Sequence, residues 1–269
     1  MQRLRFRERY GRWAIIAGGS EGIGAAFARA LAAEGMDLVL VAEKPEPLES
    51  FARELRENSQ REVRAIVADL GDVASLERLS SLACELEVGA LVCNAAAVPF
   101  GVFLDVGRAE KLRAIDVNCR APLWLVDAMA PAMVARGRGA IVLMSSLARR
   151  QGSALFATYA ATKAFDLVLA ESLHDELAPR GVDVLGVCAG ATRTPGWNTA
   201  GGQPLSLAPP VMEPDEVARE ALSALGRTPS LVSGRWNRLA TFFLERVLPR
   251  RVAIETLGRS TRKIFRSRL

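Results

Sequence analysis

The sequence predicts an α/β fold, a doubly wound parallel sheet that forms a single domain followed by a C-terminal helical tail. Short apolar segments alternate along the chain with longer stretches of helical periodicity, which is the pattern of a parallel α/β sheet. Several of the short segments are apolar throughout, as expected of strands covered by helices on both faces. Half of the 269 residues are apolar, enough for one large core.

The expected strands are six apolar segments and a shorter seventh, and the expected helices lie between them. The strands cover residues 14–17, 38–42, 63–68, 90–93, 140–144, 182–187 and 231–233. The helices cover residues 23–34, 48–58, 74–87, 111–136 and 156–178, the last ended by Pro179 and Gly181. Residues 189–214 are rich in Gly, Pro, Ser and Thr, so we expect a long loop that serves the substrate as a lid.

The chain divides into an α/β domain, residues 1–235, and a basic amphipathic tail, residues 236–269, hinged at Pro249. Residues 246–269 carry eight basic groups against Glu255, a net charge of +7, so the remainder of the +5 chain carries −2. Such a terminus could contact anionic lipid, nucleic acid or an anionic ligand, or could be a solvated helix face or a subunit contact. Because a basic pI is weak evidence for nucleic-acid binding, we expect no nucleic-acid partner.

The location predicted from composition is the cytoplasm. The N-terminus lacks the apolar core of a signal peptide, and no run approaches the ~20 apolar residues of a membrane span. The four cysteines are far apart and lie in apolar or helical stretches, where reduced, buried thiols are expected. His174 is the only histidine, so we expect neither a multi-histidine metal site nor a histidine-based triad, and no metal.

A glycine-rich loop directly after the first strand predicts a dinucleotide phosphate site. The loop carries Gly18, Gly22 and Gly24, with Ser20 and Ile23 between them, and runs into a helix. A strand, a glycine loop and a helix N-terminus present backbone N–H groups to a phosphate. Because the spacing G-x-x-x-G-x-G differs from the usual G-x-G-x-x-G, a plain tight turn stays an alternative.

Polar residues at the ends of the next strands extend this site. Asp69, with Leu70, ends the third strand and Asn94 ends the fourth, at the sheet edge where such folds bind ligands. Asp69 could instead be a helix N-cap. Glu43 ends the second strand, where an acidic group binds the adenosine ribose and repels a 2′-phosphate, so it favours NAD over NADP; Lys44 argues the other way.

Tyr159 and Lys163 form the candidate catalytic pair. Residues four apart share a helix face, so the phenol and the ammonium can converge, and the ammonium favours the phenolate. Ser146 follows the fifth strand and could hydrogen-bond the substrate oxygen, although a capping role is the alternative. Asn118, polar among apolar neighbours, either satisfies buried backbone or holds a proton-relay water beside Lys163.

Together these motifs resemble the short-chain dehydrogenase/reductase family over roughly residues 10–235, which implies a Rossmann fold. The matching residues are Gly18, Gly22, Gly24, Asp69, Asn94, Asn118, Ser146, Tyr159, Lys163, Gly190 and Thr194. The departures are Ala17, Cys93, Ala96 and Ala189, where the family has Thr, Asn, Gly and Pro. These touch the edges of the cofactor site and leave the Asn-Ser-Tyr-Lys tetrad complete.

The resemblance assigns roles to these residues. It implies that Tyr159 is the acid/base, that Lys163 lowers its pKa and binds the nicotinamide ribose, and that Ser146 polarises the carbonyl. Cofactor contacts are further implied for the loop residues Gly190, Thr192 and Thr194. NADP-preferring members commonly carry Arg where Glu43 stands. The family likeness also implies a homodimer or homotetramer.

Three functions are open at this point. The opening segment 9–16, followed by Ser-Glu-Gly-Ile-Gly, resembles a bacterial subgroup that includes hydroxysteroid dehydrogenases. The leading hypothesis is therefore interconversion of a secondary alcohol and a ketone on a bulky apolar molecule such as a hydroxysteroid. A 3-oxoacyl thioester reductase uses the same residues, and a nucleotide-sensing or membrane-associated binding protein is the alternative without turnover.

Further residues have both a substrate-directed and a structural interpretation. Arg149 and Arg150 could meet a substrate carboxylate or be solvated, and His174 is expected to be structural. The apolar loop residues could line the substrate pocket or anchor the loop; they are Trp197, Leu205, Leu207 and Met212.

Overall fold

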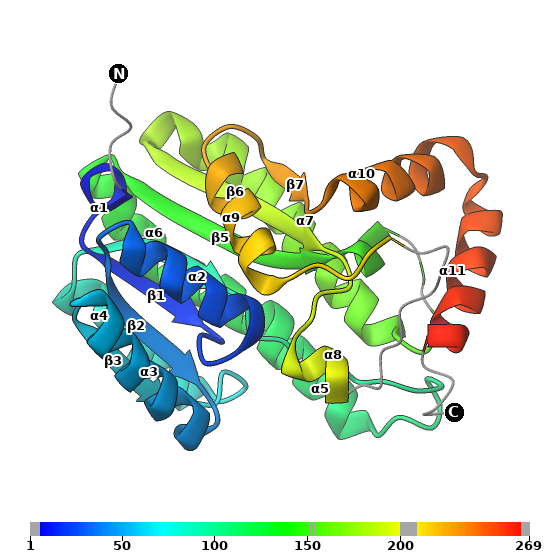
Figure 1. The fold of residues 1–269 in the computed structure, drawn as a ribbon, viewed down its shortest axis with the longest axis horizontal. Helices are drawn as coiled ribbons and strands as arrows, with labels where there is room; N and C mark the ends of the chain where they lie inside the picture. The colour runs from blue at the N-terminus through cyan, green and yellow to red at the C-terminus, as the bar shows by residue number, and fades with distance from the viewer. Residues whose placement is uncertain (1–5, 151, 153, 200–208, 265–269) are drawn as a thin grey trace.

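A single parallel sheet covered by helices on both faces forms the body of the protein, as the computed structural model shows (Figure 1). The structure describes residues 6–150, 152, 154–199 and 209–264. The seven strands lie in the order β3-β2-β1-β4-β5-β6-β7, and every pair of neighbours is parallel. The chain therefore reverses its direction of travel across the sheet between β1 and β4, where open α/β sheets bind their ligands.

All seven expected strands are present, and their apolar residues are buried except in the two edge strands, β3 and β7, where most are partly exposed. The strands are β1 (Trp13–Ala17), β2 (Asp37–Ala42), β3 (Val63–Val67), β4 (Val88–Cys93), β5 (Gly139–Ser146), β6 (Val182–Ala189) and β7 (Ser230–Val232). β5 extends two residues further than the sequence pattern predicted, so Ser146 is the last residue of the strand instead of lying beyond its end.

The helices cover both faces of the sheet and form the C-terminal tail. The α-helices are α1 (Phe6–Tyr10), α2 (Gly22–Ala33), α3 (Pro45–Ser59), α4 (Val73–Glu85), α5 (Arg108–Ile115), α6 (Ala121–Arg136), α7 (Ala157–Leu177), α8 (Pro195–Thr199), α9 (Pro214–Ala224), α10 (Arg235–Phe242) and α11 (Arg250–Ile264). Short π or 3₁₀ segments are η1 (Asp116–Arg120), η2 (Leu147–Arg150), η3 (Ala178–Arg180) and η4 (Phe243–Val247).

The single helix expected over residues 111–136 is interrupted by the π-helical segment η1. Pro122 explains the interruption, because it has no N–H to donate to the carbonyl of Asn118 four residues earlier. Single π turns of this kind are frequent at functional sites. Here the turn leaves the Asn118 side chain fully buried.

The core consists of two apolar clusters, one on each face of the sheet. One cluster joins α2, α3 and α9 to the sheet, and Phe27, Leu48 and Val217 are fully buried in it. The other joins α4, α6 and α7, with Leu76 and Met133 at its centre. Because both faces are covered, the central strands β1 and β4 are apolar throughout, as expected from their sequences.

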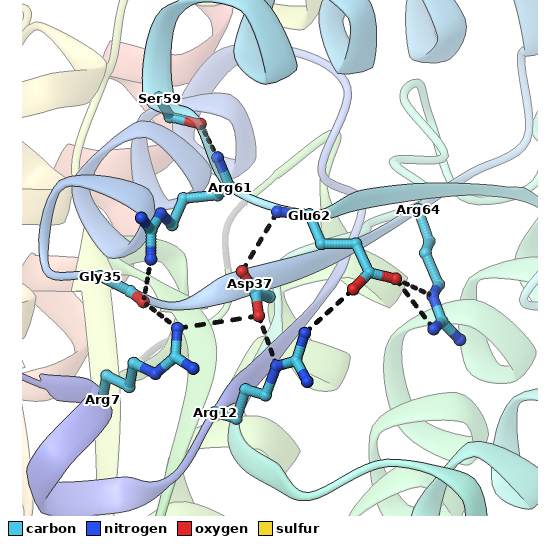
Figure 2. A network of polar contacts seen from close by, with 8 residues as sticks. All are labelled: Arg7, Arg12, Gly35, Asp37, Ser59, Arg61, Glu62 and Arg64. Atoms are coloured by element: carbon cyan, nitrogen blue, oxygen red, sulfur yellow. Dashed lines mark hydrogen bonds and ion pairs between the residues drawn. The ribbon is translucent and has the colours of Figure 1, made fainter.

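A polar network closes the sheet edge at the amino ends of β1, β2 and β3 (Figure 2). Asp37 is 4% exposed and accepts hydrogen bonds from the Arg12 guanidinium at 2.6 Å and from the Glu62 backbone at 3.1 Å. Arg7 lies 3.8 Å from the same carboxylate. Burial alone would raise the pKa of Asp37, but these partners outweigh it and the pKa is lowered.

The cysteines are free, but they are not all buried. Cys93 and Cys188 are buried, Cys119 is half-buried and Cys84 is exposed on α4. The expectation of a buried thiol is therefore wrong for Cys84, which lies on the solvent side of an amphipathic helix. Among the described residues, no helix has the length and apolar character needed to cross a bilayer.

Candidate active site

The glycine loop after β1 is held against the carboxyl ends of the central strands. The backbone N–H groups of Gly18 and Gly19 both donate to the carbonyl of Val41, at 2.8 and 3.1 Å. Gly18 has a φ of +85°, which L side chains rarely adopt, and a Cβ there would lie 2.5 Å from the backbone nitrogen of Ala95. A Cβ at Gly24 would collide with the carbonyl oxygen of Gly18. Glycine is thus required at these positions by the packing of the loop.

The loop after β6 closes over the start of α2. A Cβ at Gly22 would come within 2.9 Å of the Thr194 side chain, so these two predicted cofactor residues are in contact. The Thr194 hydroxyl accepts a hydrogen bond from the N–H of Trp197 at 3.1 Å and so caps α8. Thr192 is buried and donates to the carbonyl of Gly190 at 3.0 Å.

Asn94 connects β4 to the glycine loop, as its position at a strand end predicted. Its Nδ2 donates to the carbonyl of Gly18 at 2.8 Å. Of the other predicted contacts, Ser20 is half-buried in the loop and Ile23 is half-buried in the first turn of α2, whereas the side chain of Leu70 belongs to the apolar core. Leu70 can therefore meet a ligand only through its backbone.

An arginine that the sequence analysis missed joins the two acidic strand ends. Arg113, on α5, lies 2.9 and 3.1 Å from the two oxygens of Asp69 and 3.0 Å from Glu43. Its side-chain hydrogen bonds lower the pKa of Asp69. The N-cap interpretation of Asp69 is wrong, because Asp72 caps α4 through the Ser75 N–H. Nothing in the sequence pattern distinguished Arg113 from the other arginines.

Tyr159 and Lys163 lie on one face of α7, as their spacing predicted. The Lys163 ammonium is 5.9 Å from the centre of the Tyr159 ring. Helix α7 packs against β5 and η2, and so against the strand that ends in Ser146. Ser146 is half-buried, and its hydroxyl oxygen accepts a hydrogen bond from the N–H of Ala148 at 3.2 Å.

The Asn118 side chain satisfies buried backbone, which is one of its two predicted interpretations. Its amide exchanges two hydrogen bonds with the backbone of Ala97, both at 2.8 Å, and donates to the Thr162 hydroxyl at 3.0 Å. The Thr162 hydroxyl in turn donates to the carbonyl of Tyr159 at 2.9 Å. The side chain therefore fixes α7 relative to the segment after β4. The Asn118 backbone carbonyl, which lacks its ordinary helical donor, is the group that could hold a water.

Lys163 is buried and engaged by the protein itself. Its ammonium donates to the carbonyl of Met144 and to Asp166 Oδ2, both at 2.8 Å. Burial alone would lower the pKa of Lys163, but the charge and hydrogen bond of Asp166, together with Tyr159 and Cys119, outweigh that effect and the pKa is raised. Asp166 was not singled out from the sequence, although an acidic residue three positions after Lys163 on a core-facing helix was a usable signal.

Of the remaining residues named from the sequence, some have structural contacts and others lie outside the described part of the chain. Arg149 is 8% exposed, so the solvated interpretation is wrong for it, and the side chain of Arg150 lies outside the described residues. His174 pairs with the carbonyl of Val184 at 2.9 Å, as a structural residue would. Met212 is part of the core and anchors the loop. Trp197 is half-buried, whereas Leu205 and Leu207 fall outside the described residues.

The C-terminal helices border the same sheet edge. On α10, Asn237 is buried and packs so closely on Gly190 that a Cβ there would lie 2.6 Å from Asn237 Nδ2. On α11, Gly258 faces Ala154, in the segment between Ser146 and Tyr159. Figure 1 shows α11 on the side of the molecule toward which the strand arrowheads point.

An aromatic cluster lies next to Tyr159. The ring of Phe156 is 6.0 Å from that of Tyr159 and 5.0 Å from that of Phe100. These rings make the surroundings of the phenol apolar. A phenol, an ammonium and a serine hydroxyl at one sheet edge, next to a glycine cradle for phosphates, are the groups needed for proton and hydride exchange between a dinucleotide and an alcohol.

Comparison with known proteins agrees with this geometry. The family model for short chain dehydrogenases matches residues 12–203. A 7β-hydroxysteroid dehydrogenase of Clostridium sardiniense is 33% identical over 236 residues, which cover 87% of this chain and 90% of that protein. A very-long-chain 3-oxoacyl-CoA reductase of Podospora anserina is 36% identical over 187 residues, 67% of this chain and 55% of that protein.

Solved structures give the same family. A structure described in work on 7β-hydroxysteroid dehydrogenase stereoselectivity superposes with a TM-score of 0.87 at 28% identity, covering 94% of this chain and 99% of that one. A short-chain dehydrogenase from Sphingobium yanoikuyae in complex with NADPH gives a TM-score of 0.75 at 35% identity, covering 88% and 96% of the two chains. The chain belongs to the short-chain dehydrogenase family, and it is an oxidoreductase that uses NAD or NADP and acts on CH–OH groups.

Proposed function

We propose that the protein interconverts a secondary alcohol and a ketone on a bulky apolar molecule such as a hydroxysteroid. The observation that carries this proposal is that Tyr159 and Lys163 lie together on α7, which packs against the strand ending in Ser146, with an aromatic cluster beside Tyr159. An aromatic wall favours a substrate whose own surface is largely apolar.

The proposed roles follow from the chemistry of the side chains. Tyr159 removes the hydroxyl proton during oxidation and returns it to the carbonyl oxygen during reduction. Ser146 donates a hydrogen bond to the same oxygen and stabilises the charge that develops on it. Lys163 favours the phenolate through its charge, and Asn118 holds a proton-relay water beside it. A nicotinamide dinucleotide held by the glycine loop would supply the hydride exchange at the substrate carbon, which none of these side chains can provide.

The glycine loop and its neighbours are the proposed dinucleotide site. The loop and the start of α2 would hold the pyrophosphate through backbone N–H groups, next to Ser20 and Ile23. The adenosine would lie near the acidic strand ends and the nicotinamide near the loop after β6. The proposed contacts are Gly18, Ser20, Gly22, Ile23, Gly24, Glu43, Asp69, the Leu70 backbone, Asn94, Tyr159, Lys163, Gly190, Thr192 and Thr194.

NAD is the proposed preference between the two cofactors. The Glu43 side chain is 66% exposed at the end of β2, where it can reach an adenosine ribose and repel a 2′-phosphate. Arg113 pairs with that carboxylate and with Asp69, so its charge is already compensated. The NADPH complex of the Sphingobium yanoikuyae relative makes NADP the alternative.

A hydroxysteroid substrate is favoured over a 3-oxoacyl thioester because the similarity to hydroxysteroid dehydrogenases extends over more of the chain. The relationship to 7β-hydroxysteroid dehydrogenases extends over 87% of this chain, whereas that to the 3-oxoacyl-CoA reductase covers 67%. Helix α11, which faces the segment between Ser146 and Tyr159, would form part of the substrate wall. Both substrate classes use the same catalytic residues, so only turnover can separate them.

The decisive experiment is a substrate screen with a tyrosine control. Hydroxysteroids and 3-oxoacyl thioesters are assayed with NAD and NADP by nicotinamide absorbance. Steroid alcohols should be turned over with the higher kcat/KM, and Tyr159→Phe should lose at least about a thousandfold of it. Tyr10→Phe is the matched control, because Tyr10 is the only other tyrosine and donates to Asp183, at the opposite edge.

The outcomes separate substrate from mechanism. Faster turnover of 3-oxoacyl thioesters would replace the substrate class, and absence of turnover on either class would refute both substrate proposals. Full activity of Tyr159→Phe would refute the proposed mechanism.

We also propose that the protein forms a homodimer or homotetramer through α5 and α7. These helices contact each other, and they expose Leu112, Ile115, Phe165 and Val168, with Val168 61% exposed. Exposed apolar side chains gathered on packed helices are typical of a subunit interface.

The cytoplasm is the proposed location of the protein. Its free cysteines fit a reducing compartment.

We further propose that the chain consists of a domain, residues 1–235, and a tail, residues 236–269, and that the tail contacts an anionic lipid surface. Trp236, Leu239 and Phe243 follow each other at helical spacing, and each is about half exposed. Arginines at 235, 246, 250 and 251 flank this stripe. An apolar stripe with aromatic residues and a cationic border is the pattern of helices that lie in a membrane interface. Contact of the same stripe with a second copy of the chain is the alternative.

A further inference from the structure

A buried carboxylate lies beside the proposed catalytic lysine. Asp166 is 2% exposed, on the same helix as Lys163, and its Oδ2 accepts a hydrogen bond from the Lys163 ammonium at 2.8 Å. The Lys163 side chain is itself only 4% exposed. Among the described residues, Asp166 Oδ1 is one of the few buried side-chain oxygens that have no hydrogen-bond partner.

Burying the Asp166–Lys163 ion pair costs free energy of folding. Removing two charges from water costs several kcal/mol per ion, and a well-packed apolar pair of similar volume is often as stable or more so. The unpartnered Oδ1 adds to this cost. Stability alone therefore does not account for a carboxylate at this position, three residues after Lys163.

The geometry restricts the ammonium strongly. A lysine ammonium has three donors, and here one goes to Asp166 and one to the carbonyl of Met144 on β5. One donor is left for a water or for a ribose hydroxyl. The ammonium is thus held 5.9 Å from the Tyr159 ring before any ligand arrives.

Among the described residues, Asp166 is the only carboxylate that acts on the charge of Lys163. Tyr159 on α7, Cys93 on β4 and Cys119 on η1 are the other titratable groups that interact with the pair. Burial, and then Asp166, raise the pKa of Cys119 to about 11, and the same causes raise that of Cys93, so both thiols stay neutral. Without Asp166, the burial of Lys163 would be opposed by no full negative charge at neutral pH.

We propose that Asp166 is a positioning residue of the catalytic centre, which keeps Lys163 in its charged form and fixes the ammonium beside Tyr159. The proposal rests on the proposed roles of Tyr159 and Lys163. The pH range in which the enzyme is active would then depend on Asp166 as well as on Tyr159 and Lys163. Because Asp166 touches Lys163 and not the substrate, it acts through the lysine.

The direct test measures the charge of Lys163 itself. The chain has four lysines, at 44, 111, 163 and 263, so ¹³C-labelling of the lysine ε-carbons gives four NMR signals, of which Lys163→Arg removes one. In the wild-type protein, the Lys163 signal should titrate above the other three. In Asp166→Asn it should titrate at least about one pH unit lower, because burial then acts without its partner. An unchanged Lys163 titration in that variant refutes the proposal.

Controls separate charge from packing. Asp166→Glu keeps the carboxylate and should keep the high Lys163 titration, and Asp175→Asn makes the same substitution at an exposed position of α7 and should change nothing. If Asp166→Asn does not fold, the wild-type protein still tests the proposal. A wild-type Lys163 that titrates at the same pH as the other lysines, or at a lower pH, overturns it.

The kinetic test uses the pH profile of the enzyme with its cofactor. In Asp166→Asn, kcat/KM for alcohol oxidation should fall on the alkaline side at a pH about one unit lower than in the wild type, because Lys163 loses its proton earlier. A profile that is scaled down but not displaced would mean a purely structural role and refute the proposal. The NMR result does not depend on turnover, so failure of the proposed substrate would leave it intact.

Discussion

Asn94 Nδ2 donates a hydrogen bond of 2.8 Å to the carbonyl of Gly18, a residue 76 positions earlier in the chain. The backbone N–H groups of Asn94 and Ala95 both donate to the carbonyl of Ala17, at 2.9 and 2.8 Å, so the two strand ends are joined by three hydrogen bonds. The shape of the glycine loop therefore depends on β4 as much as on the loop's own sequence.

Asn94→Ala should weaken cofactor binding while leaving the chemical step nearly unchanged. The Gly18 carbonyl would lose its partner, at a cost of about 1–1.5 kcal/mol, so the cofactor Kd should rise about five- to tenfold. Cofactor titration by nicotinamide fluorescence measures this, with Asn198→Ala on α8 as the exposed control. A variant with unchanged Kd would show that the loop keeps its shape without Asn94.

Glu43→Arg should shift the preference of the enzyme from NAD toward NADP. The substitution replaces a carboxylate that would repel the 2′-phosphate with a group that can pair with it, beside Arg113. The ratio of kcat/KM for NADP to that for NAD should rise at least about tenfold, or ~1.4 kcal/mol. Glu46→Arg on α3 changes the net charge equally and is the control. A wild-type enzyme that already prefers NADP would contradict the proposed cofactor.

Asp37 should make the protein less stable in acid. Its folded pKa is lowered, so its contribution to stability is complete above the unfolded pKa of about 3.9 and is lost as the pH falls through the folded value. Asp37→Asn should reduce the free energy of unfolding by about 1–3 kcal/mol at pH 7, with the difference from wild type shrinking below about pH 4. Urea unfolding from pH 7 to pH 3 measures this, and Asp127→Asn, exposed on α6, is the control. A difference that stays constant across that range would argue against the ionised carboxylate as the cause.

The apolar stripe on α10 and η4 should bind vesicles that contain anionic lipid. Trp236→Ser combined with Phe243→Ser should abolish co-sedimentation with phosphatidylserine vesicles, and raising the salt concentration should weaken the wild-type interaction. Leu104→Ser, which removes an 87% exposed apolar side chain elsewhere, should have no effect. Absence of vesicle binding, together with a dimer that dissociates in the double variant, would assign the stripe to a second copy of the chain.

The local features of this protein could be predicted from its sequence because they depend on local periodicity and spacing. Apolar runs identified all seven strands, and a four-residue interval placed Tyr159 and Lys163 on one helix face. Glycines at 18, 22 and 24 identified the loop after β1 because a parallel sheet needs a tight turn there. These are properties of neighbouring residues, and tertiary packing did not change them.

The tertiary structure decided which distant side chains meet. Arg113 reaches Glu43 and Asp69, and Asn237 packs on Gly190, contacts that no spacing in the sequence could indicate. The π turn at Asn118 was not predicted either, although Pro122, which causes it by lacking an N–H, is visible in the sequence. For Asp166 the two levels are combined. The three-residue interval places it beside Lys163 on one helix, but only the packing of α7 against β5 buries both side chains, where burial strengthens the interaction of the two charges.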